Sequence, residues 1–75
     1  MAITEASLNL FLRIAREAKN WGGNPWVEVI DLTAEERGNF TQLKQAGLLS
    51  VQGAGRDAFI HFSEAGESLA LQNGI

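Results

Sequence analysis

Apolar side chains recur every three or four residues near the start of the chain, at Leu8, Phe11, Leu12, Ala15 and Ala18. Positions with this spacing lie on one face of an α-helix, so the pattern predicts a helix over residues 4–19. Thr4 is suited to cap its N-terminus, and the Gly-Gly pair at 22–23 is suited to end it. Leu10 and Ile14 widen the apolar stripe, which predicts that several elements pack on this helix.

Residues 24–32 (Asn-Pro-Trp-Val-Glu-Val-Ile-Asp-Leu) fit two different structures. Asn24 followed by Pro25 is typical of a helix start. The β-branched residues at positions 27, 29 and 30 favour a strand instead. Periodicity cannot assign an apolar run this short, so a short strand and a short helix both stay open, and the strand is slightly favoured.

The segment Thr33–Glu36 (Thr-Ala-Glu-Glu) matches a capping box, in which the Thr33 hydroxyl accepts from the backbone N–H of Glu36 and the Glu36 carboxylate returns the bond. A helix over residues 34–46 is therefore expected. Gly38 weakens this helix by ~1 kcal/mol relative to alanine, so a break at Gly38-Asn39 is an alternative. The residues expected to face inward are Phe40, Leu43 and Ala46 or Gly47.

A β-hairpin is expected over residues 48–62, after a glycine at position 47 that is placed to end the preceding helix. Two stretches of alternating apolar and polar residues flank the turn sequence Gly-Ala-Gly-Arg-Asp at 53–57. Ser63 then caps a last helix over about 64–72, and Asn73-Gly74 is suited to stop it. The expected order of elements is helix, short element, helix, hairpin, helix.

Length and composition limit the possible functions. A chain of 75 residues without cysteine is expected to form a single domain over residues 1–75, held by one apolar core without disulfides. His61 is the only histidine, so the usual patterns for a zinc site or a catalytic triad are missing, and we expect no cofactor and no enzyme. No apolar run is long enough to cross a bilayer, and no signal peptide is recognised, so a cytoplasmic protein is expected.

Several packing signals in the second half of the chain form one pattern. Thr33 opens a helix, Leu43 follows about three turns later, and a Gly-Leu-Leu run at 47–49 leads into a strand. Residues 62–66 (Phe-Ser-Glu-Ala-Gly) vary a "leucine-threonine-glutamate-x-glycine" helix start. Over residues 32–70 these motifs resemble the winged-helix superfamily, especially the bacterial multiple-antibiotic-resistance-regulator type. The resemblance implies an α+β domain with a helical core, a β-hairpin wing and a C-terminal helix.

The resemblance also implies a helix-turn-helix, DNA-binding regulator of transcription from a bacterium or a phage. The 34–46 helix would then read double-stranded DNA, because Asn and Gln can pair with adenine and Arg or Lys can reach guanine. The wing tip would carry a basic residue to the flanking groove. The nucleic-acid-binding residues predicted in this way are Arg37, Asn39, Thr41, Gln42, Lys44, Gln45 and Arg56. An ordinary solvated helix face explains the six helix residues about equally well, and a plain turn explains Arg56 slightly better.

The formal net charge of −3 favours an alternative, a winged-helix adaptor that binds another protein and not DNA. Phosphate contacts need local positive charge, whereas the expected reading helix begins with Glu35-Glu36. Trp21 and Trp26 are the first candidates for a partner contact, since tryptophan is a common interface anchor, although a place in the core would also explain them.

The two hypotheses predict different surfaces. DNA binding requires a contiguous positive surface that includes Arg37, Lys44 and Arg56, together with a base from the first helix. A homodimer or a second protein would strengthen this binding, because single modules bind DNA weakly. An adaptor requires an exposed apolar or acidic patch, either near the two tryptophans or along residues 64–72.

Overall fold

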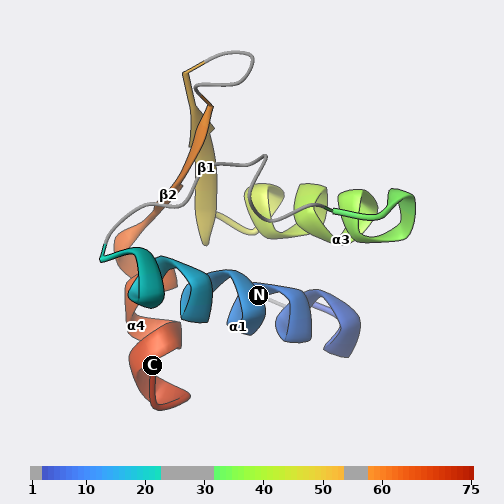
Figure 1. Ribbon diagram of the computed structural model, residues 1–75. Coiled ribbons are helices and arrows are strands. Elements are labelled where there is room, and N and C mark those ends of the chain that lie inside the picture. The colour runs from blue at the N-terminus through green and yellow to red at the C-terminus, as the bar shows by residue number, and fades with distance from the viewer. Residues whose placement is uncertain (1–2, 23–31, 54–57) are drawn as a thin grey trace.

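The computed structural model describes residues 3–22, 32–53 and 58–75 (Figure 1). Within these ranges the chain is an α+β protein with three helices and one two-stranded antiparallel hairpin. The elements are α1 (Glu5–Trp21), α3 (Ala34–Gln45), β1 (Leu49–Gln52), β2 (Phe59–Phe62) and α4 (Glu64–Gln72). The strand-or-helix alternative for residues 24–32 lies outside the described residues, apart from Leu32, which packs against the core.

Helix α1 confirms the first prediction and is two residues longer than expected at its C-terminus. The Thr4 hydroxyl caps it by accepting from the backbone N–H of Ser7 at 3.2 Å. Gly22 ends it in the left-handed conformation, with φ of 71°, which glycine adopts without strain. Within the wide apolar stripe, Phe11 and Ile14 have no solvent exposure and Leu10 and Ala15 are buried, while the other residues are partly buried.

Helix α3 runs without a break through Gly38, so the alternative of two short helices is wrong. Both bonds of the capping box are present at its N-terminus, at 3.1 Å from the backbone N–H of Glu36 to Thr33 Oγ1 and 3.0 Å for the return bond. At its C-terminus, the backbone N–H groups of Gly47 and Leu48 donate to the carbonyls of Lys44 and Leu43. This Schellman pattern, with φ of 75° at position 47, fixes the end of the helix. The capping box, the Schellman turn and the buried face together stabilise α3 more than the low helix propensity of one glycine destabilises it.

The hairpin follows α3 directly, as the sequence predicts. Leu49 pairs with Phe62 and Val51 pairs with Ile60, so these four side chains share one face of the ribbon. Leu49 and Ile60 are buried in the core, while Ser50 and His61 stand opposite each other on the exposed face. Figure 1 shows the hairpin rising from the C-terminal end of α3 and away from α1.

Helix α4 is held against the start of β1 by a hydroxyl and a glycine. Ser63 caps α4 by accepting from the backbone N–H of Gly66 at 3.1 Å. Its own N–H and Oγ donate to the carbonyl of Leu48, at 3.1 and 3.0 Å. A Cβ atom at position 66 would lie only 2.0 Å from the Leu48 carbonyl oxygen, so glycine is what permits this close approach.

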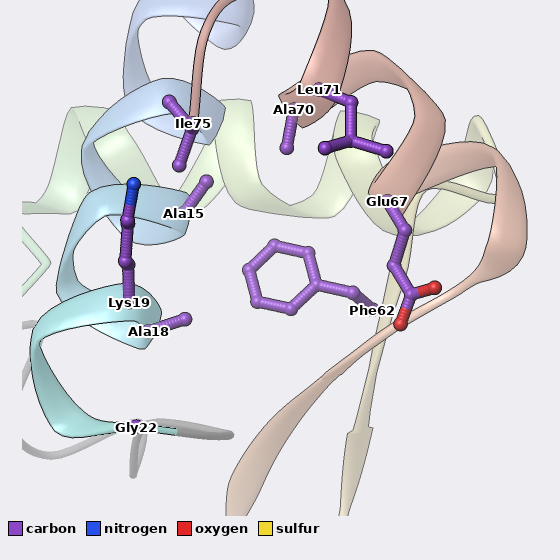
Figure 2. Close-up of a pocket in the computed structure, with 9 residues that line it drawn as sticks. All are labelled: Ala15, Ala18, Lys19, Gly22, Phe62, Glu67, Ala70, Leu71 and Ile75. Atoms are coloured by element: carbon purple, nitrogen blue, oxygen red, sulfur yellow. The ribbon is translucent and has the colours of Figure 1, made fainter.

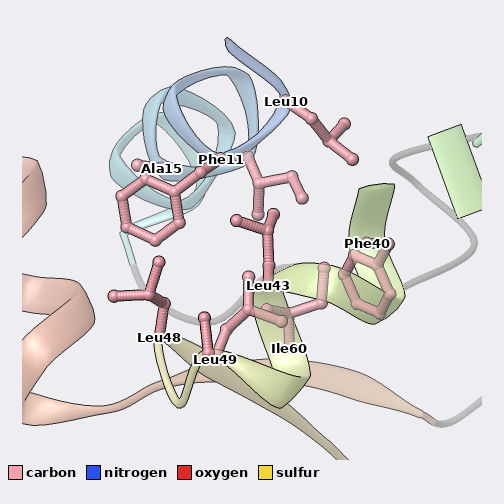
Figure 3. Close-up of a cluster of buried hydrophobic side chains, with 10 residues drawn as sticks. Leu10, Phe11, Ala15, Phe40, Leu43, Leu48, Leu49 and Ile60 are labelled. Carbon is pink, nitrogen blue, oxygen red and sulfur yellow. The ribbon is translucent and has the colours of Figure 1, made fainter. Parts of the chain in front are cut away.

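One apolar cluster joins the three described parts of the chain (Figure 3). Helix α1 supplies Phe11, α3 supplies Leu43 and the hairpin supplies Ile60, and all three are fully buried. The Phe11 and Phe62 rings meet edge to face, with centroids 5.8 Å apart. Among the described residues, no helix combines the length and the apolar character needed to cross a membrane.

Candidate nucleic-acid interface

Helix α3 has one face against α1 and one face towards solvent. Phe40 and Leu43 are buried on the α1 side. The solvent face combines small, polar and basic residues and contains no large apolar side chain. Four of the six predicted α3 contact residues lie on this face and are exposed: Arg37, Thr41, Lys44 and Gln45.

The other two predicted α3 residues, Asn39 and Gln42, are turned towards the N-terminal end of α1. Ser7 Oγ donates to Asn39 Oδ1 at 3.4 Å. The backbone N–H and the hydroxyl of Thr4 donate to Gln42 Oε1, at 3.1 and 3.2 Å. Both amide oxygens are therefore occupied within the fold, and in this conformation neither amide is free for the two-point contact with adenine expected from the sequence.

Two local contacts lie on the exposed side of α3, one to the Lys44 side chain and one to the backbone of Arg37. Lys44 Nζ lies 5.4 Å from the centroid of the Phe40 ring, within the range of a cation–π contact. Thr41 Oγ1 donates back to the carbonyl of Arg37 at 3.0 Å. Gly38 lies between Arg37 and Thr41 in the sequence, and a Cβ atom at position 38 would have no neighbour within 4 Å. The centre of this face is therefore open backbone, which a partner could approach closely.

The carboxylate of Glu36 is bound within the fold. Its Oε2 accepts from Arg13 Nη1 at 2.6 Å, which ties α3 to α1. The backbone N–H of Thr33, and after it Arg13, lower the pKa of Glu36 below the ordinary carboxyl value, and partial burial opposes them. Glu36 is thus an ionised group already paired with a cation, and of the two acidic residues at the helix start Glu35 is the one that faces solvent.

Three predicted contact residues cannot be placed on this surface. Arg56 and Trp26 lie outside the described residues, and of Trp21 only the backbone, at the end of α1, is described. Of the bases of α1, Arg13 pairs with Glu36 of α3, and Lys19 lies at the edge of a groove beside α4. On α3 itself, the exposed bases are Arg37 and Lys44.

The structure contains an apolar groove of about 560 Å³ between α1 and α4, which is shown in Figure 2. An exposed apolar patch along residues 64–72 is what the adaptor hypothesis predicts. The sequence signal for it is Leu71, a leucine near the end of the last helix that remains 72 % exposed. The other lining residues could not be assigned from the sequence, because Ala15, Ala18 and Phe62 fit the core equally well.

Among residues 3–22, 32–53 and 58–75, no group of three or more His, Asp or Glu side chains could hold a metal ion. No protein-family model, no curated protein and no solved structure matches this chain. The function is therefore inferred from the solvent face of α3 and the groove between α1 and α4.

Proposed function

We propose that the protein is a winged-helix DNA-binding protein that docks α3 in the major groove and regulates transcription. The observation that carries this proposal is the solvent face of α3, where Arg37 and Lys44 lie about two helical turns apart on an exposed strip that contains no acidic side chain between them. A helix fits the major groove when its outward residues are small or polar, and Gly38, Thr41 and Gln45 meet this condition.

The arrangement of α3 and the hairpin supports the winged-helix assignment. The Schellman turn at Gly47 and Leu48 leads from α3 into β1 without an intervening loop. The hairpin consequently stands beside the C-terminal end of α3 (Figure 1). In winged-helix docking the helix enters the major groove while the hairpin lies on the adjoining backbone, and an exposed β-ribbon next to the helix fits this role.

The ion pair between Glu36 and Arg13 reduces the repulsion that the acidic start of α3 would exert on DNA phosphates. The Glu36 carboxylate is compensated by Arg13, so Glu35 is the acidic group that phosphates would meet at the helix start. Roughly two phosphate contacts, from Arg37 and Lys44, would give a weak, salt-sensitive complex for one copy of the chain. Gln45 is the candidate for a base contact, since it is exposed and sits next to Lys44.

The test is a titration of mixed-sequence duplex DNA at several salt concentrations. The observed association constant should fall with salt, with a log–log slope of about −0.9 for each phosphate contact. Lys44→Glu should weaken binding and lower the magnitude of the slope by about 1. Arg16→Glu is the matched control, because Arg16 is an exposed base on α1 and its reversal changes the net charge by the same amount.

The comparison of these two variants separates a local contact from a general charge effect. If Lys44→Glu loses much more affinity than Arg16→Glu, α3 touches the phosphates. Equal losses would show that only the total charge matters and would remove α3 from the interface. No binding of the unaltered protein at low salt would refute the proposal altogether.

A protein-binding adaptor is the second candidate, and the apolar groove at α4 is the observation that favours it. The formal charge of −3 is in line with a protein partner. An adaptor would show no salt-dependent affinity for DNA, and it would lose its partner when Leu71 is made polar. The DNA titration therefore discriminates between the two functions.

A further inference from the structure

The groove between α1 and α4 has an apolar floor. Phe62 lies at its centre (Figure 2), and its ring meets the buried Phe11 ring edge to face. Ala15 and Ala18 of α1 form one wall, and α4 forms the other. Leu71 stands on the α4 wall and is 72 % exposed, the largest value among the large apolar side chains of the described residues. An apolar groove with an exposed leucine at its edge is typical of an interaction site.

The two edges of the groove carry opposite charges. Lys19 stands on the α1 edge and Glu67 on the α4 edge, on either side of Phe62 (Figure 2). Neither side chain has an ion-pair partner among the described residues. The same groove therefore presents a cation along one side and an anion along the other, with apolar surface between them.

This charge pattern is complementary to itself. In a twofold dimer the same surface of both copies meets, and residues on opposite sides of the axis face each other. With the axis along the groove, Lys19 of one copy faces Glu67 of the other, and both pairs form at once. We propose that the occupant of the groove is a second copy of this chain, with Leu71 of each copy packed against the α1 wall of the other, at Ala15 and Ala18.

Such a dimer leaves the proposed DNA surface accessible. Figure 1 shows α3 and α4 on different sides of α1, and the solvent face of α3 points away from α1. A second copy on the groove would therefore cover neither Arg37 nor Lys44. Two copies would present two α3 helices, which doubles the number of phosphate contacts.

The first experiment measures the mass of the protein in solution by sedimentation over a range of concentrations. The unaltered protein should change from the 8.1 kDa chain to twice that mass as the concentration rises. Leu71→Glu should raise the dissociation constant of the dimer by about tenfold or more. Gln72→Glu is the matched control, because it adds the same charge one residue later on an exposed side of α4 that does not line the groove, and it should leave the dimer intact.

The second experiment tests the symmetry of the contact by charge reversal. Lys19→Glu and Glu67→Lys should each be monomeric, because each homodimer would place like charges opposite each other twice. Mixed together, the two variants should form a heterodimer, since both facing pairs are then of opposite charge. Only a contact between copies with Lys19 facing Glu67 predicts recovery on mixing, and circular dichroism of each variant verifies that it is folded.

Three results would overturn the inference. The first is an unaltered protein that stays monomeric up to about 1 mM, the weak end of specific association. The second is a dimer that is unaffected by Leu71→Glu, and the third is the lack of a heterodimer when Lys19→Glu and Glu67→Lys are mixed. A monomer that binds a different protein through the groove would assign this surface to the adaptor function. The DNA titration is a separate measurement. A monomer that binds DNA refutes only this inference. A dimer that does not bind DNA refutes only the proposed function.

Discussion

Two glycines lie inside helices, Gly38 in α3 and Gly66 in α4, and replacing each with alanine provides a matched pair of perturbations. By helix propensity alone, both substitutions should stabilise the protein, since glycine costs up to ~1 kcal/mol relative to alanine. The surroundings of the two positions differ. A Cβ atom at position 38 has no neighbour within 4 Å, whereas at position 66 it would lie 2.0 Å from the carbonyl oxygen of Leu48.

The expected effects therefore have opposite signs. Gly38→Ala should gain about 1 kcal/mol, which corresponds to a rise in Tm of roughly 4–8 °C for a domain of this size. Gly66→Ala must move α4 away from Leu48 by more than an ångström, against the two bonds that Ser63 makes to that carbonyl. Overpacking and weakened hydrogen bonds together should cost about 2–4 kcal/mol, a large share of the roughly 4–11 kcal/mol expected for a chain this long.

Urea unfolding followed by circular dichroism measures both changes. The control is Ala65→Gly, an exposed position of α4 next to Gly66, which should lose no more than ~1 kcal/mol because only propensity changes there. If Gly66→Ala proved as stable as the unaltered protein or more so, α4 could not be seated on Leu48 as the structure has it. If Gly38→Ala were destabilising, the solvent face of α3 would have to be covered within the fold.

Three further predictions concern α3. Gln42→Ala should cost about 1 kcal/mol in unfolding free energy, because the N–H and hydroxyl of Thr4 lose their acceptor, and DNA affinity at constant salt should stay unchanged. The pKa of Glu36 is lower in the folded protein than in the unfolded chain. Its ionised carboxylate therefore stabilises the fold above the unfolded pKa, and this stabilisation is lost as the pH falls through the folded pKa. In urea unfolding between about pH 3 and 6, Glu36→Gln should lose less unfolding free energy on acidification than the unaltered protein. Gly38→Ala should weaken DNA binding in a gel-shift assay although it stabilises the fold, because its methyl group would stand on the face that approaches the bases.

Local sequence signals predicted most of the described fold, because they are chemical and short-range. The caps at Thr4, Thr33 and Ser63 satisfy N–H groups within three residues, so they can be read from the sequence. The alternation of apolar residues around the turn predicted the hairpin for the same reason. The break considered at Gly38 was wrong because propensity is a weak preference, which tertiary contacts of Phe40 and Leu43 override.

The sequence could not predict which polar side chains of α3 face solvent, because that depends on the rotation of α3 about its own axis. Asn39 and Gln42 belong to residue types that read bases, but they lie on the side of α3 that meets the N-terminus of α1. Which polar residues face a neighbouring helix is decided by packing between elements more than thirty residues apart in sequence. The groove was anticipated only as a patch along 64–72, since its other wall comes from α1.

Net charge alone does not discriminate between DNA binding and protein binding, because the placement of each charge matters more than the sum. At physiological ionic strength, charges more than about 8–10 Å apart are largely screened, and the protein extends over 29 × 26 × 17 Å. The acidic residues of α4 lie on a different side of α1 from α3 (Figure 1), so they contribute little to the potential that a phosphate meets at Lys44. As salt is removed their repulsion reaches further, and the log–log slope of DNA binding should flatten at low salt.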